Sequence, residues 1–182
     1  MSNIYKYIVY ILLSILCKII AKEVIIENEN INDLENVIKD NSQEESLILK
    51  FKERYYDMSN FPFKKIYFLV NSNVTFSGYS DGTILDFKNI TNGIMDITYS
   101  EHKGITLKFE NMIFKNFGGQ EIKTADYMFE IDFDSDENYL QFENCTFMNI
   151  QYTIFYILNL NASYKKYNNN SDYFITFVNC NF

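Results

Sequence analysis

The chain has 182 residues, 47% of them hydrophobic, which suffices for one domain with a sizeable core. Its formal net charge is −8, and loss of Lys6 and Lys18 with the leader described below would make it −10. Because phosphate binding needs a basic face, we expect no nucleic-acid partner.

Residues 1–21 are predicted to form a signal peptide. Lys6 precedes the apolar stretch Tyr7 to Leu16, and Ala21 offers a small residue near the cleavage site. The apolar run is shorter than the roughly 20 residues of a membrane-spanning helix, although retention of the leader as an anchor stays open. We expect the mature protein to be secreted or held at the cell surface.

Residues 22–72 are predicted to form an N-terminal cap and the first strands. Within Ile31 to Lys39 the apolar residues share one helical face, and Asn30 or Asn32 is available as the N-cap. We therefore expect one short amphipathic helix here. A later strand ends in Gly78, where we expect a corner at positive φ, which glycine adopts freely.

Residues 73–182 are organised around a repeated frame. F-x-N-x-x-F begins at Phe109, Phe142 and Phe177, so the frame recurs after 33 and then 35 residues. A sequence repeat at intervals of this size indicates a solenoid. Apolar and polar residues alternate on both sides of the Asn, as in two short strands that meet at a corner. The runs are too short and too aromatic for helices, so each repeat is predicted to be a β-coil.

Asparagine has a physical reason to stand at these corners. A bend between strands needs one residue at positive φ, which Asn tolerates better than other non-glycine residues. Its amide can also bond to the Asn about 4.8 Å away in the next coil. We predict two Asn ladders, the first formed by Asn111, Asn144 and Asn179 and the second by Asn89, Asn116 and Asn149.

Cys145 and Cys180 directly follow two ladder asparagines, so we expect them to stack on the inner face of successive coils. Two interpretations stay open for an exported protein. A disulfide would need a Cβ separation of about 3.8 Å, closer than in-register parallel neighbours usually come. Two buried thiols that pack as small apolar residues are therefore favoured.

A predicted strand, a short helix and a strand are followed by NVTFSG, GTILDFKN and LKFENMIFKNF. In these features the chain resembles the right-handed parallel β-helix proteins of the pectin lyase-like superfamily. The resemblance covers Glu23 to Phe182. It implies an all-β, right-handed parallel β-helix with a short N-terminal capping helix. Because Phe182 aligns with Phe114 and Phe147 in the repeat, we expect the fold to be truncated at its C-terminus inside a coil. Loops, where such a fold carries specificity, are predicted at 118–126, 134–138 and 161–172.

The sequence lacks the motifs that the resemblance would imply for an enzyme. Lyases of this superfamily use an Arg or Lys beside acid-bound calcium, and its hydrolases use NTD and DD motifs. The single arginine, Arg54, precedes the coils, and His102 is expected at the surface. The acid run from Asp132 to Glu137 lacks the glycine and glutamate of a calcium loop and is interpreted as a solvated turn. We therefore expect no catalytic residue, no metal and no cofactor.

Five N-glycosylation sequons occur in the chain. Asn161 and Asn169 lie in the longest predicted polar loop, and we expect these two to carry glycan if the host is a eukaryote. Asn89 and Asn144 are expected to be inaccessible in the ladders.

Two functional classes remain. The first is an exported non-catalytic β-helix module with a surface, adhesive or scaffolding role that binds a carbohydrate or a protein. The alternative is the N-terminal part of a polysaccharide lyase or glycoside hydrolase, and the missing motifs favour the first. The apolar strands at 174–182 are also expected to support end-to-end self-association, since exposed strand edges template pairing.

Overall fold

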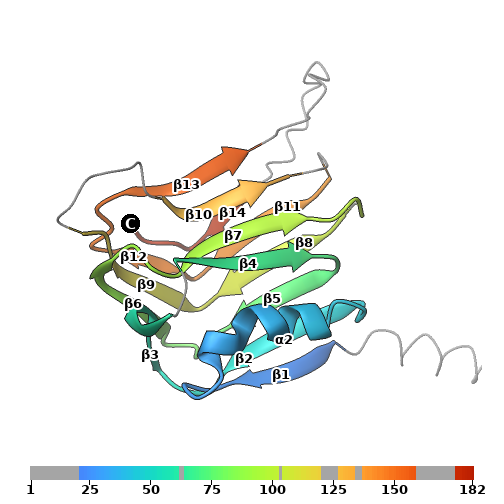
Figure 1. Ribbon diagram of the computed structural model, residues 1–182, viewed down its shortest axis with the longest axis horizontal. Helices are drawn as coiled ribbons and strands as arrows, with labels where there is room; N and C mark the ends of the chain where they lie inside the picture. The colour runs from blue at the N-terminus through green and yellow to red at the C-terminus, as the bar shows by residue number, and fades with distance from the viewer. Residues whose placement is uncertain (1–20, 62–63, 103, 120–126, 134–136, 159–174) are drawn as a thin grey trace, which may run out of the picture.

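The computed structural model describes residues 21–61, 64–102, 104–119, 127–133, 137–158 and 175–182. All strand pairs in this part of the chain are parallel, and the strands stack into three sheets that wind as a solenoid (Figure 1). The predicted all-β parallel solenoid with one short helix near its N-terminus is confirmed.

Each coil adds one strand to each sheet in the same order. Sheet A contains β1 (Lys22–Ile26), β2 (Ser46–Phe51), β5 (Asn73–Ser77), β8 (Thr106–Glu110), β11 (Tyr139–Glu143) and β14 (Ile175–Val178). Sheet B contains β3 (Tyr55–Asp57), β6 (Thr83–Ile90), β9 (Met112–Phe117) and β12 (Thr146–Met148). Sheet C contains β4 (Lys65–Val70), β7 (Ile94–Tyr99), β10 (Tyr127–Asp132) and β13 (Thr153–Leu158).

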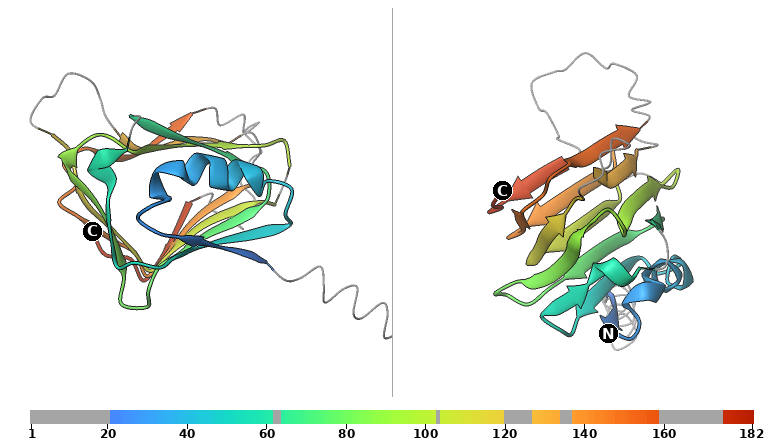
Figure 2. Two further views of the ribbon diagram at one scale, coloured as in Figure 1. Left: turned by 60° about the horizontal axis from the view of Figure 1, so that its bottom comes forward. Right: turned by 60° about the vertical axis from the view of Figure 1, so that its left-hand side comes forward.

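The strands β2, β3 and β4 already belong to these three sheets, so the solenoid begins before residue 73. Among the described residues, helical turns occur only in 22–72, and the first such segment lies between β1 and β2. It consists of η1 (Ile31–Asp33) and α2 (Leu34–Asp40), and a second 3-10 turn, η2 (Met58–Asn60), follows β3. Viewed along the solenoid in the left panel of Figure 2, α2 lies across the opening at the N-terminal end.

The helix forms where the sequence predicts it, and its apolar side faces the core. Leu34 and Ile38 are buried, and burying two such side chains contributes about 1.5–3 kcal/mol each. Asn30 stands at the N-cap position of η1, as predicted, but its side chain makes no capping hydrogen bond, and none caps α2, whose N-cap is Asp33. Asn30 instead accepts from the backbone N–H of Glu27 and donates to the carbonyl of Ile25, which fixes the turn after β1.

Aromatic rings fill the solenoid because in-register pairing repeats the same inward position in each coil. Phe109 stacks on Phe142 with 5.1 Å between ring centroids, and Phe142 stacks on Phe177 at 5.2 Å. Phe76 continues the column on the other side of Phe109 at 4.5 Å. These separations suit offset stacking of aromatic pairs. The F-x-N frame thus supplies the central column of the core.

The six predicted asparagine corners all have positive φ, between 52° and 62°. Gly78 occupies the equivalent corner of the preceding coil, since its N–H donates to the Glu110 carbonyl as that of Asn111 does to Glu143. The predicted positive φ at Gly78 was wrong. Glycine is needed there for space, because a Cβ would stand 2.4 Å from the carbonyl oxygen of Asn111.

Candidate functional site

The first predicted ladder comes together on the outer surface of the corner between sheets A and B. Asn144 Nδ2 donates to Asn111 Oδ1 at 3.3 Å, and Asn179 Nδ2 donates to Asn144 Oδ1 at 3.3 Å. Asn144 and Asn89 are exposed, contrary to the expectation that ladder residues are inaccessible. The amides bond side by side along the outside of the corner, while the residues that follow them face inward.

The second ladder is shorter than predicted. Asn149 Nδ2 donates to Asn116 Oδ1 at 3.1 Å, but Asn116 Nδ2 donates to Asp86 Oδ1 at 2.9 Å and not to Asn89. A bulge in β6 explains the correction, because the register against β9 shifts between Asp86 and Ile90. Asn89 is displaced from the ladder, and the buried carboxylate of Asp86 accepts the hydrogen bond from Asn116 in its place.

Several sequence predictions lie outside the described residues. These are the glycosylation sites Asn161 and Asn169 and nearly all of the leader, of which only residue 21 is described. No helix within the described ranges has the length and apolar character needed to cross a membrane.

The two cysteines are free thiols in matching positions of successive coils. Cys145 Sγ contacts the Phe109 carbonyl oxygen at 3.4 Å, and Cys180 Sγ contacts that of Phe142 at 3.5 Å. Burial raises the pKa of the Cys145 thiol to about 12, so this side chain is neutral and unreactive at neutral pH. Cys180 is only partly buried, so just one of the two fits the prediction of a buried thiol.

The outer face of sheet C carries a row of four tyrosine and acidic side chains in register. Tyr67 on β4 lies opposite Asp96 on β7, which lies opposite Glu130 on β10, which lies opposite Tyr156 on β13. Tyr67 and Tyr156 are 55% and 46% exposed. Three strand spacings separate them, about 14 Å. An aromatic side chain therefore stands at each end of the row, with two carboxylates between. We call this set the sheet C row.

A lysine ties the two carboxylates of the row together. Lys65 Nζ lies 3.1 Å from Asp96 Oδ2 and forms a second ion pair with Glu130 Oε2. The Tyr127 hydroxyl donates to Glu130 Oε2 at 2.9 Å, and the Tyr127 ring stacks on Tyr156 with centroids 4.8 Å apart. The side chains of Lys65, Asp96 and Glu130 are 29%, 16% and 11% exposed, and the ion pairs hold them against one another.

The pKa values in the row depend on one ammonium group, that of Lys65, which forms ion pairs with the carboxylates of both Asp96 and Glu130. Burial raises the pKa of Asp96, and the charge of Glu130 adds to this, while the hydrogen bond from Lys65 works against it. Burial opposes the charge of Lys65, but hydrogen bonds to Glu130 and Asp96 hold the pKa of this ammonium above its ordinary value. Lys65 is charged at neutral pH, and the cluster keeps one excess negative charge when both carboxyls are ionised.

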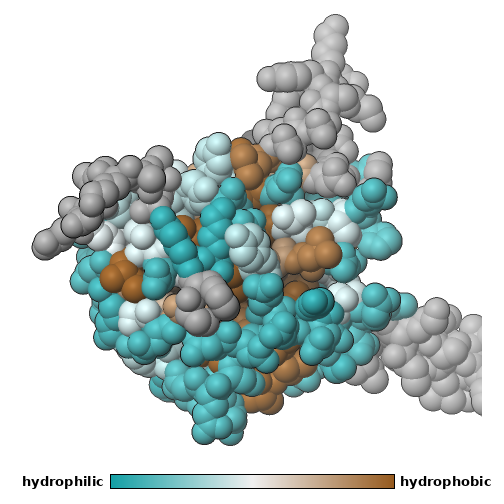
Figure 3. Space-filling model, viewed as in Figure 1, coloured by the Kyte–Doolittle hydropathy of each residue, from teal (hydrophilic) through white to brown (hydrophobic). Residues whose placement is uncertain are grey.

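Figure 1 shows β13, β10, β7 and β4 side by side with α2 beyond β4, and Figure 3 shows the surface in the same view. Over β4, β7 and α2 the surface is mostly hydrophilic, with pale and brown side chains between the teal ones. Leu69 on β4, which is 55% exposed, contributes apolar surface next to Tyr67. The face thus alternates ring surface with hydrogen-bonding groups.

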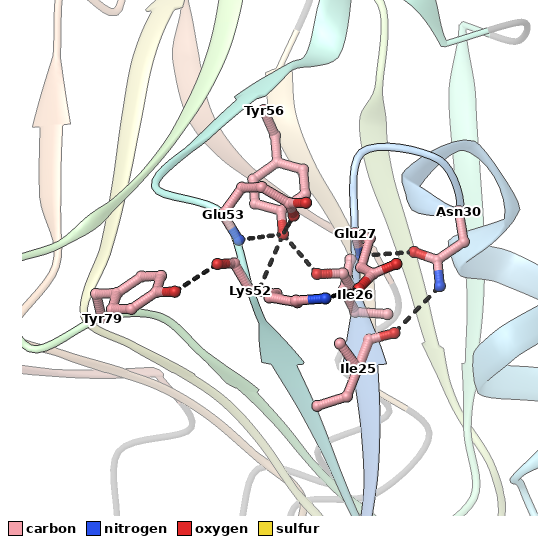
Figure 4. A network of polar contacts seen from close by, with 8 residues as sticks. All are labelled: Ile25, Ile26, Glu27, Asn30, Lys52, Glu53, Tyr56 and Tyr79. Carbon is pink, nitrogen blue, oxygen red and sulfur yellow. Dashed lines mark hydrogen bonds and ion pairs between the residues drawn. The ribbon is translucent and has the colours of Figure 1, made fainter.

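In two other polar clusters the hydrogen-bonding and charged groups are paired with one another, and these contacts stabilise the fold. Figure 4 shows one at the N-terminal corner, where the Tyr56 hydroxyl accepts from the backbone N–H of Lys52 and of Glu53, each at 3.1 Å. The same hydroxyl lies 2.5 Å from the carbonyl oxygen of Ile26. On sheet A, Lys108 forms ion pairs with Glu110 and Glu143. In the first cluster Tyr56 is fully buried, so its ring offers no surface to a ligand, and the charged groups on sheet A face one another across strands.

The residues considered for catalysis are not brought together. Arg54 pairs with Asp81, and His102 is exposed. Within the described ranges, no three His, Cys, Asp or Glu side chains are grouped to hold a metal ion. Of the acid run, Asp132 ends β10 and Glu137 stands in a turn, while residues 134–136 fall outside the description.

The sheet C row was missed in the sequence, although a signal was present. Ile94-Met95-Asp96-Ile97 and Met128-Phe129-Glu130-Ile131 both set an acid into an otherwise apolar strand. An acid at the same place in two stacked strands predicts a polar pair on one face.

Comparison of the chain with family models, with curated proteins and with solved structures gives no match.

Proposed function

We propose that this protein is an exported, non-catalytic β-helix module that binds a carbohydrate on the outer face of sheet C, in a surface, adhesive or scaffolding role. The observation that supports the proposal is the sheet C row, in which exposed Tyr67 and Tyr156 flank two carboxylates. A tyrosine ring covers the C–H face of a sugar ring, and its hydroxyl stays available for hydrogen bonds. Ionised carboxylates accept from sugar hydroxyls in charge-assisted bonds.

The charge of the face limits the class of glycan. The row keeps one excess negative charge, and the whole chain has a formal net charge of −8. A polymer of uronic acids would meet like charge on the face, so a neutral or amino-bearing polysaccharide is the better ligand. The similarity of the coils to the pectin lyase-like superfamily supports a carbohydrate ligand as an analogy at the level of fold.

Removing a ring from the row tests the proposal. We expect Tyr67→Ala to reduce retention on insoluble polysaccharide about tenfold, because such a loss corresponds to roughly 1.4 kcal/mol from one exposed aromatic contact. The measurement is a sedimentation assay with chitin, chitosan and cellulose. Tyr79→Ala is the matched control, since Tyr79 is 37% exposed away from sheet C. Retention by none of the polymers, or equal loss in both variants, contradicts the proposal.

The chain should not cleave uronic polymers. Asp96 and Glu130, the paired carboxylates of the row, are both engaged by Lys65. We expect no release of unsaturated or reducing ends from polygalacturonate, with or without calcium, measured by ultraviolet absorbance and by a reducing-sugar assay. Product formation that Asp96→Asn or Asp132→Ala abolishes would favour the alternative of a polysaccharide lyase or glycoside hydrolase.

A further inference from the structure

The N-glycosylation sequons in the described part of the chain differ in the environment of their asparagines. Three sequons lie within the described ranges, and they begin at Asn73, Asn89 and Asn144. All three asparagines are exposed, so exposure alone does not rank them. What separates them is the contacts of the side-chain amide, the group to which an N-linked glycan is attached.

Asn144 is held on both sides by the first ladder. Its Nδ2 donates to Asn111 Oδ1, and its Oδ1 accepts from Asn179 Nδ2, each at 3.3 Å. A sugar on this nitrogen would be crowded by the amides of the two neighbouring coils, which lie about 4.8 Å away on either side. The ladder therefore opposes a glycan at Asn144.

Asn73 is held by one contact and stands in a hollow. Its Oδ1 accepts from the backbone N–H of Thr106 at 2.8 Å. The side chain also lines a surface cavity of about 530 Å³, whose walls include His102 and Ile105. A glycan on Asn73 would have to leave between these walls, so we expect lower occupancy here than at Asn89.

Asn89 has an unengaged amide on a backbone that other groups fix. Within the described ranges no hydrogen bond involves its side chain, because the bulge in β6 displaces it from the second ladder. The backbone N–H of Lys88 donates to Asp86 Oδ1 at 2.9 Å, and Lys88 Nζ lies 3.4 Å from Asp86 Oδ2. On the other side, the carbonyl of Ile90 accepts from the N–H of Gly118 at 3.3 Å. The φ of 62° at Asn89 therefore does not depend on its amide.

We propose that Asn89 carries an N-linked glycan at the end of β6, where the chain passes from sheet B to sheet C. Thr91 supplies the hydroxyl that the sequon requires and is partly exposed. The inference rests on the export stated in the proposed function, because such glycans are carried on surface segments of secreted proteins.

The modification is a glycosyl transfer from a lipid-linked oligosaccharide diphosphate, which the secreting cell supplies. Asn89 Nδ2 forms a bond to the anomeric carbon of the oligosaccharide, and the bond from that carbon to the diphosphate oxygen breaks. The lipid diphosphate leaves with the bonding electron pair, and Nδ2 gives up one proton to a base of the transferring enzyme. The amide keeps its second N–H.

Peptide mapping of the secreted protein tests the inference. The full chain, with its leader, is produced in cultured eukaryotic cells and collected from the medium. Enzymatic release of glycans in heavy-oxygen water converts each glycosylated asparagine into a labelled aspartate, which mass spectrometry locates. We expect the label at Asn89 in most of the molecules and no label at Asn144.

Two matched variants remove the hydroxyl of a sequon and leave its asparagine in place. Thr91→Val should remove one glycan, seen as a single step to higher mobility on a denaturing gel. Thr146→Val, the same change in the sequon of Asn144, should leave the mobility unchanged. Neither substitution alters a residue at positive φ, so both variants should fold.

The possible failures are distinguishable. A secreted chain without label at Asn89, label at Asn144, or unchanged mobility of Thr91→Val overturns the inference while export stands. A chain that stays inside the cells and carries no glycan overturns the export in the proposed function, and the inference with it.

Discussion

Replacing Phe109 by alanine should lower the free energy of unfolding by about 4 kcal/mol, the usual range for a buried phenylalanine. Phe109 is fully buried and stacks between Phe76 and Phe142. Its edges also meet Phe114 and Phe129, from sheets B and C. The variant therefore leaves a cavity where the three walls meet. Urea unfolding followed by circular dichroism measures the loss.

Two further variants make this result interpretable. Phe109→Leu keeps most of the apolar volume and should cost only about 1.5 kcal/mol. Tyr67→Ala removes an aromatic of similar size from the surface and should change stability by about 0.5 kcal/mol or less. If Phe109→Ala and Tyr67→Ala destabilise equally, the stacked column is not the core of the solenoid.

Asn144→Leu should lower the free energy of unfolding by about 2 kcal/mol or more. It places a branched side chain at a φ of 52° and removes both ladder hydrogen bonds, to Asn111 and from Asn179. Thermal unfolding detects the loss as a lower midpoint. Because Asn144 is exposed, we attribute more of the loss to backbone strain than to the amides.

A pair of small substitutions separates these two causes. Asn144→Gly and Asn144→Ala both remove the amide, but only alanine is strained at positive φ. We expect the alanine variant to be about 1 kcal/mol less stable than the glycine variant. The opposite order would show that the left-handed corner is not what selects asparagine.

The corners and the central column could be predicted from the sequence because they depend on short-range pattern. The frame that begins at Phe109 places an inward ring two residues before a positive-φ Asn, and this spacing repeats wherever the frame does. Gly78 and Asn89 were assigned from the same pattern and were wrong in detail. At Gly78 the carbonyl of Asn111 lies too close for a Cβ, and at Asn89 a bulge shifts the register. Both depend on the neighbouring coil.

The sheet C row could be predicted only in part, because it joins residues whose spacing along the chain varies. Tyr67 and Asp96 are 29 residues apart, whereas Asp96 and Glu130 are 34 apart. The connections between these strands differ in length, so sequence spacing does not predict which residues lie opposite one another. The alignment is set by the hydrogen-bonded pairing of β4 with β7 and of β7 with β10. The ion pairs of Lys65, which reach across two strands, have no local signal.

The claim that sheet C is the binding face is tested most directly by tyrosine footprinting. The folded chain is iodinated with and without saturating hexamers of glucosamine or N-acetylglucosamine, and modified residues are located by mass spectrometry. We predict that the sugars protect Tyr67 and Tyr156 and leave Tyr55 and Tyr79, which are exposed on other surfaces, as reactive as before. Unchanged reactivity of Tyr67 and Tyr156 at saturation, or protection confined to Tyr55 and Tyr79, would contradict the account.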